Sequence, residues 1–428
     1  MWPLNVAMRN DSIRFLTAVS VPPKAFDLET DRSNAVSHAA SAKSQLEIKD
    51  SFPAMERLPL RPTFPLNIRS FLSNGFPTGL ALAAILLAQL APAPGVPTNS
   101  LRGAPSGIET AGASLVSPET DRAILRGLQF IAASQNPDGS FGTNASTRNN
   151  VAVCALCGLA FLSAGHTPGR GEFGDHVDRA VKFLLKSTQA NGYINIPENS
   201  GHGPMYGHGF ATLFLAEVYG MTQQPEIHDK LDRAVKLIIN SQNKEGGWRY
   251  HPIKNDADVS VTVCQIMALR AARNSGMHVP KETIEACLKY VQKCQNTDGG
   301  FKYQLIQGSE SQFPRSAAGL VALYSGGVYE GKSVEKSLDY LRRFQPGTNR
   351  NVRLYEQHYF YGHYYAVQAM WLAGGKDWLQ WYPAIQEELL QVQQINGSWE
   401  DQFSPEYGTA MACIILQMPN CYLPIFQR

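Results

Sequence analysis

Two kinds of apolar pattern alternate along residues 116–420. In the first kind, apolar side chains recur every third or fourth position with charged residues between them, as at Val177, Ala180, Val181 and Leu184. This spacing predicts an amphipathic helix that buries one face. Segments of the second kind are rich in Ala, Gly, Cys, Leu and Met and carry little charge, which predicts helices buried on all sides. They cover residues 151–163, 210–219, 259–272, 317–324, 364–373 and 409–417.

A short phrase separates each amphipathic segment from the apolar one that follows. It contains a glutamine, an Asn or Asp residue, one or two glycines and usually an aromatic residue, and it is degenerate at Phe344-Gln345-Pro346-Gly347. Glycine after Asn or Asp permits a positive φ and ends the preceding helix. The glutamines recur about every fifty residues, which indicates an internal repeat. They lie at positions 135, 189, 242, 295, 345 and 394.

Six repeats, each with an outer amphipathic helix and an inner apolar helix, predict an all-α fold. We expect an (α/α)6 toroid of six helix pairs in two concentric rings, within residues 113–428. An open solenoid is the alternative. Solenoids need polar caps on their terminal repeats, whereas the last apolar segment is as apolar as the middle ones.

Residues 1–112 show no helical period and are rich in Pro, Ser and Ala, so we expect a largely disordered region. An apolar run at 80–91 follows Arg57, Arg61 and Arg69 and is too short to span a bilayer. The pattern resembles a secretory signal at about 79–95, with Met55 as the true start. It predicts an exported protein, periplasmic or membrane-associated, in preference to a cytoplasmic one. A disordered tail with a chance apolar run is the alternative.

Composition narrows the function classes. The 428 residues are 44% hydrophobic and 17% charged, with a net charge of +2 and no basic run, so no nucleic-acid partner is expected. Seven cysteines occur, and most are expected to be small buried hydrophobes. Cys287 and Cys294 lie seven residues apart on one helix, too far for a disulfide.

In a closed ring the first turns of the inner helices meet at one mouth, where their free N–H groups favour an anion. Polar residues just before each inner helix are therefore the site candidates. In chain order they are Arg148, Asn149, Asn150, His202, Tyr206, His208, Asp256, Asp258, Ser260, Gln312, Arg315, Tyr355, Glu356, His358, Tyr359, Tyr361, His363, Glu406 and Tyr407.

One candidate pattern occurs twice. Tyr206-Gly207-His208 in the second repeat recurs as Tyr361-Gly362-His363 in the fifth, on opposite sides of a six-fold ring. With Arg315, these tyrosines and histidines are predicted to bind substrate in a pocket suited to an apolar or cationic ligand. The alternative is that the aromatic rings plug the centre and the backbone satisfies the histidines. Metal binding by the histidine pair lacks a third ligand at suitable spacing.

The repeated phrase resembles the QW motif of the terpenoid cyclase and protein prenyltransferase superfamily, best kept at Gln242–Trp248 and Gln394–Trp399. This resemblance covers all six repeats and implies a squalene-cyclase-like toroid. In that family the glutamine ties helix ends together and the aromatic residue packs beside it. The motif lies away from the catalytic cavity, so it reports the fold.

Neither active site of that superfamily is complete here. Class II cyclases protonate an alkene with the middle aspartate of D-x-D-D-T, and this chain reads Asp258-Val259-Ser260-Val261-Thr262. Serine stands at the position of the acid, which leaves Asp258 as the candidate catalytic residue if its register shifts. Asp258 before a helix is also an ordinary N-cap. The prenyltransferase zinc pair Asp-x-Cys does not occur, so no metal or other cofactor is predicted.

Four functions stay open at this point. We expect a toroid that binds an isoprenoid or other apolar small molecule, with membrane association open and no protein partner indicated. The alternatives are an active terpenoid cyclase with an unusual acid, a structural or protein-binding toroid, and a carbohydrate-active toroid. The last would need paired carboxylates near the mouth, for which Glu356 and Glu406 are candidates besides the two aspartates.

Overall fold

The computed structural model describes residues 115–427 except 145–146, 198–202, 307–308 and 348–357. These residues belong to the second of two compact units, Val96–Arg428. The expected disordered region 1–112, the signal-type segment at 79–95 and Met55 lie outside the described residues. No described helix is both long and apolar enough to cross a bilayer.

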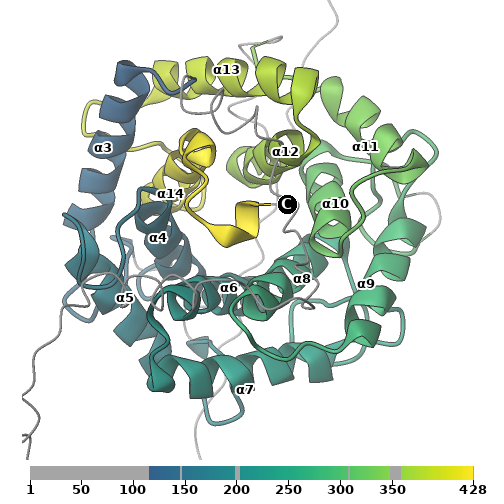
Figure 1. The fold of residues 1–428 in the computed structure, drawn as a ribbon, viewed down its shortest axis with the longest axis horizontal. Coiled ribbons are helices and arrows are strands. Elements are labelled where there is room, and N and C mark those ends of the chain that lie inside the picture. Colours follow the sequence, from purple (N-terminus) through teal and green to yellow (C-terminus); the bar gives the residue numbers. More distant parts are fainter. Residues whose placement is uncertain (1–114, 145–146, 198–202, 307–308, 348–357, 428) are drawn as a thin grey trace, which may run out of the picture. The chain divides into compact units, whose positions relative to one another are not determined.

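The described residues form twelve α-helices and no β-strand. Figure 1 shows them as two concentric rings, in which outer and inner helices alternate along the chain. The outer helices are α3 (Pro118–Ala133), α5 (Gly174–Lys186), α7 (Pro225–Ser241), α9 (Lys281–Cys294), α11 (Lys332–Arg342) and α13 (Gly375–Val392). The inner helices are α4 (Val151–Ser163), α6 (Pro204–Thr222), α8 (Val259–Asn274), α10 (Phe313–Ser325), α12 (Tyr359–Ala373) and α14 (Pro405–Leu416). The predicted (α/α)6 toroid is confirmed.

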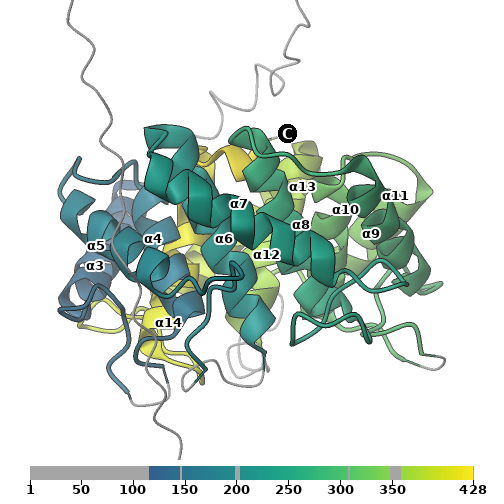
Figure 2. The same ribbon diagram turned by 90° about the horizontal axis from the view of Figure 1, so that it is seen from below.

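The ring is closed, so the open solenoid is wrong. Each inner helix packs on the next, and α14 packs on both α4 and α3. Seen from the side in Figure 2, the inner and outer helices lie at the same level. A hydrogen bond joins the ends of the ring: the Nε2 group of Gln393 donates to the carbonyl of Ala123 on α3 at 2.8 Å.

The repeated glutamine has one structural role. The amide of Gln242 donates to Gly246 O at 2.8 Å within its own turn and to Thr283 O of the next outer helix at 2.9 Å. Gln135 and Gln295 make the corresponding pairs of bonds. One side chain therefore closes its own turn and binds it to the following repeat.

The structure corrects this assignment in two repeats. In the sixth repeat Gln393, not Gln394, makes both bonds, while the Gln394 side chain donates to Val392 O at 3.2 Å. In the second repeat Thr188 precedes the turn glycine by four residues, as Gln135, Gln242 and Gln295 do, and Gln189 lies one position later. Two adjacent glutamines at 393 and 394 made the register ambiguous in the sequence.

The turn glycines lie against the backbone of the next outer helix. Gly246 has a φ of 102°, and a Cβ atom added to it would lie 2.2 Å from Ala286 O on α9. Gly139, Gly192, Gly299 and Gly397 also have a positive φ, and a Cβ atom added to each would meet the backbone of the next outer helix within 2.5 Å. Glycine is therefore required twice, by conformation and by contact.

Several inner helices begin earlier than the apolar pattern predicted. The α6 helix begins at Pro204, α10 at Phe313, α12 at Tyr359 and α14 at Pro405. Proline suits the first turn because it lacks the N–H that would be unpaired there. The polar and aromatic residues of these first turns carry no apolar period, so the sequence placed them in loops.

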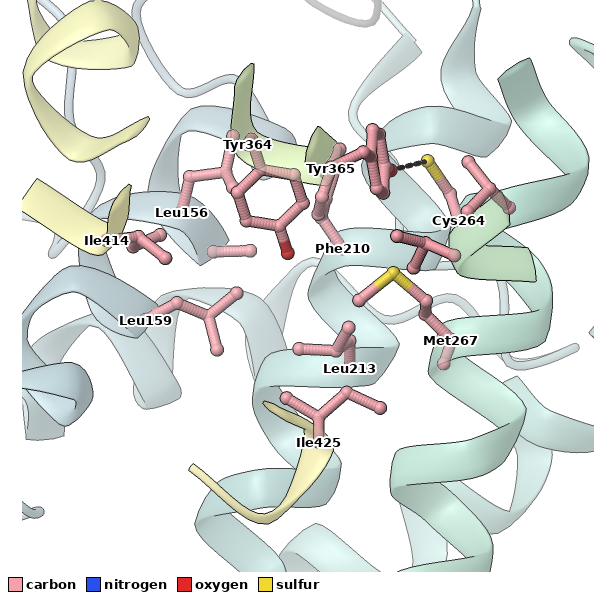
Figure 3. Packing of buried hydrophobic residues seen from close by; sticks show 14 of the residues in the cluster. Leu156, Leu159, Phe210, Leu213, Cys264, Met267, Tyr364, Tyr365, Ile414 and Ile425 are labelled. Carbon is pink, nitrogen blue, oxygen red and sulfur yellow. Dashed lines mark hydrogen bonds between the residues drawn. The ribbon is translucent and has the colours of Figure 1, made fainter. Parts of the chain in front are cut away.

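The far end of the inner ring is closed by the C-terminal segment. Two short 3-10 helices, η4 (Met418–Asn420) and η5 (Pro424–Phe426), follow α14. Ile425 and Phe426 are buried, and η5 packs on α8. Figure 3 shows Ile425 beside Leu213 of α6, with Leu159 of α4 nearby. The inner ring therefore has a filled core at this end.

The cysteines match their expected role. Six of the seven are buried, Cys421 is half-buried, and none forms a disulfide. The thiol of Cys264 lies 3.2 Å from the hydroxyl of Tyr365, and burial raises the pKa of this thiol to about 12. It is therefore an un-ionised core group.

The glycine contact can be tested with a matched pair of variants. Gly276 also has a positive φ of 97°, but an added Cβ would meet nothing within 4 Å. Both Gly246→Ala and Gly276→Ala should lose about 1–2 kcal/mol for the backbone conformation. We expect Gly246→Ala to lose at least about 2 kcal/mol more, because its methyl group overlaps α9. Urea unfolding measures both, and equal losses would contradict the contact.

Candidate functional site

A cavity of about 710 Å³ lies at the N-terminal ends of the inner helices. Its wall includes residues from the first turns of all six, so the mouth expected from the sequence is present. The lining residues on these helices are Val151, Ala152, Leu156, Pro204, Tyr206, Gly207, Phe210, Ser260, Arg315, Tyr361 and Tyr407. Unpaired first-turn N–H groups give such a mouth a partial positive charge.

One wall of the cavity is aromatic. The ring of Tyr206 lies 6.3 Å from that of Tyr250 and 6.4 Å, edge-on, from that of Tyr361. The hydroxyl of Tyr361 donates to Ser260 O at 2.8 Å, which fixes its ring against α8. Phe210 and Leu156 line the cavity and continue into the core drawn in Figure 3. The cavity therefore has an apolar floor.

The three positions of the repeated Tyr-Gly-His pattern face different sides of their helix. Both copies lie inside inner helices, where each residue turns the side chain by about 100°. Tyr206 lines the cavity, and a Cβ on Gly207 would lie 2.7 Å from Val151 of the neighbouring inner helix. His208 therefore faces away from the cavity.

His208 serves the turn of its own repeat. It is fully buried, and its Nδ1 atom accepts a hydrogen bond from Ile194 N at 3.2 Å. Thr262, Ser316 and Thr409 accept the corresponding bond in three other repeats. Burial lowers the pKa of His208 to about 4, so the ring is neutral at pH 7. The structure thus corrects its predicted position on the cavity.

His363 also lies outside the cavity lining. It is buried against Phe313, Tyr359 and Trp381, with ring centroids 5.0, 4.5 and 6.0 Å away. Its partner Tyr361 lines the cavity, as Tyr206 does. Of the five residues predicted to bind substrate, Tyr206, Tyr361 and Arg315 line the cavity. A role for any of them in binding stays a prediction.

Asp258 caps α8 and lies behind the cavity wall. Its Oδ1 atom accepts from Val261 N at 2.8 Å, as an N-cap does. The side chain is fully buried, and its Oδ2 atom lies 3.8 Å from Arg249 Nε. Burial raises the pKa of Asp258 to about 6, although the Val261 N–H and the Arg249 charge oppose this. Ser260, two residues later, does line the cavity.

Arg315 is the cationic side chain of the described lining residues. Its Cζ atom lies 5.7 Å from the centroid of the Tyr303 ring, and its Nε atom is buried without a hydrogen-bond partner among the described residues. Burial lowers the pKa of this guanidinium, opposed by Tyr340, Tyr303 and Glu310. The sequence placed this residue correctly.

Some of the remaining candidate residues line the cavity and others do not. Asn150, Gln312, His358 and Tyr407 also line the cavity. Glu406 instead accepts hydrogen bonds from Thr143 N and Oγ1, which ties the sixth repeat to the first. Arg148, Asn149, Asp256 and Tyr359 are not among the lining residues. His202, Tyr355 and Glu356 lie outside the described residues.

Sequence reasoning missed three lining residues that share one register. Tyr250, Tyr303 and Asp401 each follow the buried aromatic residue of a turn by two positions. Those aromatics are Trp248, Phe301 and Trp399. An extended chain returns to the same side every second residue, so this spacing was the available signal. Burial raises the pKa of Asp401, opposed by the Phe403 N–H and the charge of His358.

Comparison with known proteins agrees with this architecture. The model of the prenyltransferase alpha-alpha toroid domain matches residues 121–232 and 229–346, together more than half of the chain. The chain belongs to this family. The family match rests on the repeats and does not assign a ligand.

Curated relatives are more distant. The chain is 25% identical over 184 residues to drimenyl diphosphate synthase of Streptantibioticus cattleyicolor and 23% identical over 187 residues to that of Streptomyces showdoensis. These matches cover 42% and 44% of this chain. The aligned region spans about a third of each relative's length, 32% and 33%.

Solved structures share the fold at low identity. An inactive α-1,6-mannanase GH76A of Salegentibacter with α-1,6-mannotriose has a TM-score of 0.54 at 8% identity, covering 70% of this chain and 99% of the mannanase. The type II terpene cyclase MstE from Scytonema with merosterolic acid A has a TM-score of 0.50 at 14% identity, covering 71% and 97%. At this identity, the two structures support the toroid fold and assign no function to this chain.

The raised pKa of Asp258 makes a prediction for stability. The folded state binds its proton more tightly than the unfolded state, whose pKa is near 3.8. The resulting stabilisation is complete below about pH 3.8 and is lost as pH rises through about 6. At about 1.4 kcal/mol per unit, wild type should lose about 3 kcal/mol more than Asp258→Asn between pH 3.5 and 7.5.

Asn retains the capping oxygen, so Asp258→Ala should be about 1 kcal/mol less stable than Asp258→Asn at every pH for the missing cap. Urea unfolding across this pH range measures all three proteins. Parallel curves for wild type and Asp258→Asn would show that the carboxyl is not destabilised by burial.

Proposed function

We propose that the central cavity binds an isoprenoid-like or other apolar small molecule. The observation that carries the proposal is the cavity itself, which has a volume of about 710 Å³ and a floor and one wall built from apolar and aromatic residues. Small-molecule sites usually measure about 300–1,000 Å³, with mostly apolar linings and a few polar groups. Arg315, Gln312, His358 and Asp401 are such polar groups here.

The relatives support the same ligand class. The curated relatives are drimenyl diphosphate synthases, and the Scytonema cyclase structure contains its product, merosterolic acid A. These proteins handle terpenoids within the same superfamily. Since the aligned region spans only about a third of the curated relatives, their reaction is not transferred to this chain.

We further propose that the usual cyclase acid and the prenyltransferase zinc site are missing. Ser260 lines the cavity at the position of the acid, and an alcohol is far too weak to protonate an alkene. Asp258 lies behind the wall as a helix cap. A cyclase that uses Asp258 as an unusual acid stays the enzyme alternative, and it requires this carboxyl to reach the cavity.

A carbohydrate-active function has less support. Glycosidases place two carboxyl groups on either side of the scissile bond. Among the described lining residues, Asp401 is the one carboxyl group. Mannotriose therefore serves as the contrasting ligand in the binding test.

Ligand binding is the direct test. Farnesyl methyl ether should bind wild type in the micromolar range, and mannotriose should not, by isothermal titration calorimetry. Ala152→Trp fills part of the cavity from α4 and should weaken binding of the ether at least tenfold. Lys289→Trp adds the same side chain at an exposed site on α9 and should bind as wild type does. Binding of mannotriose alone would replace this proposal with the carbohydrate function.

Catalysis is tested separately with squalene. Wild type should form no cyclic product, because the group at the acid position is a hydroxyl. The assay compares wild type with Asp258→Asn and detects products by gas chromatography and mass spectrometry. Cyclic product from wild type, abolished in Asp258→Asn, would establish Asp258 as the acid and restore the enzyme alternative.

A further inference from the structure

One charged side chain of the cavity lining has no counter-ion. Arg315 is the third residue of α10, and no described residue forms an ion pair or a hydrogen bond with its guanidinium. Its Nε atom is buried without a partner, and the side chain as a whole is half-buried. A cation that leaves water without a partner loses free energy, so such groups are normally paired. The arginine is therefore a charge for which the described structure provides no balance.

The helix starts around the cavity add to this positive charge. The first turn of a helix carries a partial positive charge from its unpaired N–H groups. Gln312, the N-cap of α10, makes no side-chain capping bond, and neither do Gly203 before α6 and His358 before α12. All three N-cap residues line the cavity. The charge of Arg315 is thus repelled by its own helix start, and an anion in the cavity would offset both.

Tyr303 holds the guanidinium in place. The Cζ atom of Arg315 lies 5.7 Å from the centroid of the Tyr303 ring, which covers one face of the cation. The N–H donors of a guanidinium lie in its plane, so this contact leaves them able to bind a ligand. Tyr303 is itself fixed, because its carbonyl accepts from Val259 N at 3.0 Å. A donor group that is already positioned loses little entropy on binding.

The floor of the cavity lies deeper than the arginine. Leu156 is the sixth residue of α4 and Phe210 the seventh of α6, and both line the cavity and continue into the core shown in Figure 3. Because the inner helices all begin at the cavity, three or four residues place this floor about 5 Å below the level of Arg315. A ligand with one charged end and an apolar chain fits this arrangement.

The charges of the lining favour a head group with a single negative charge. Among the described lining residues, Arg315 is the arginine and Asp401 the carboxyl group. One guanidinium balances one carboxylate, and its planar fork fits the two oxygens of that group. The further charges of a diphosphate would have no such partner and would be repelled by the carboxylate of Asp401.

We propose that Arg315 binds the carboxylate of an apolar monocarboxylic acid, such as a terpenoid acid, whose chain lies on the cavity floor. The inference rests on the proposed function, because it names the polar end of a ligand of the same cavity. A neutral ligand with the same chain keeps the apolar contacts but leaves the charge of the guanidinium unbalanced.

Farnesoic acid and methyl farnesoate are the matched probes, measured by isothermal titration calorimetry at pH 8, where the acid is ionised. The two share one chain and differ in charge and in one methyl group. Wild type should bind the acid at least about tenfold more tightly than the ester, as expected for a hydrogen bond between charged groups. The acid should also bind more tightly than farnesyl diphosphate, whose further charges have no partner.

Three variants test the role of the arginine. Arg315→Gln removes the charge and should bring the acid and the ester within twofold by weakening binding of the acid alone. Arg315→Lys keeps the charge without the planar fork, so part of the preference should remain. Arg273→Gln is the matched control, since it removes an exposed arginine in the last turn of α8, at the other end from the cavity. It should keep the wild-type ratio.

Stability without ligand separates a binding role from a structural one. Because the charge of Arg315 is unbalanced in the free protein, Arg315→Gln should fold, with a urea midpoint equal to or above that of wild type. A lower midpoint together with an unchanged ratio of acid to ester binding would assign Arg315 to the cavity wall and overturn the inference.

The outcomes distinguish this inference from the proposed function. Equal binding of acid and ester to wild type would overturn the inference and leave the proposed function in place. A preference for the acid that survives in Arg315→Gln would also overturn it, as would tighter binding of farnesyl diphosphate than of the acid. If none of the three probes binds, the cavity is not a site for such ligands, and both proposals are rejected.

Discussion

The close contact between each turn glycine and the next outer helix is the constraint on which the ring depends. At Gly139, Gly246 and Gly299 an added Cβ would lie within 2.3 Å of a backbone carbonyl oxygen of the following repeat. The glutamine four residues earlier bonds both sides of the same junction in each case. Spacing and angle between repeats are therefore set by backbone atoms, which leaves side chains at the inner-helix starts free to form the cavity.

The fold could be predicted because the same helix-pair pattern occurs in six repeats, and each repeat indicates it independently. Each repeat predicts the same outer helix, turn and inner helix. A degenerate turn such as Phe344-Gln345-Pro346-Gly347 therefore does not obscure the prediction. Helix starts were harder, because first turns exposed to a cavity need no apolar period. Because of that error, the predicted positions of His208 and His363 were wrong. Both were expected on the cavity beside their tyrosines, but two helical steps of about 100° turn their side chains to the other side of the helix.

The cavity wall between a turn and its inner helix was the least predictable part. Tyr250, Tyr303 and Asp401 lie in short connecting segments without regular structure, and their shared distance from a buried aromatic residue is what relates them. Arg249 contacts the rings of Tyr250 and Tyr303 and forms an ion pair with Asp256 at 3.0 Å. The contact with Tyr303 joins two neighbouring repeats, and it depends on how one repeat packs on the next, which a one-dimensional pattern does not contain.

The bond from Gln393 to Ala123 has a consequence for how this architecture can change in evolution. An open array of repeats can gain or lose a unit at either end, because each unit needs only its neighbours. Here the last turn must meet the first helix, so duplication or deletion of one repeat would leave both sides of that junction unmatched. We therefore expect length changes in the loops rather than in the number of repeats.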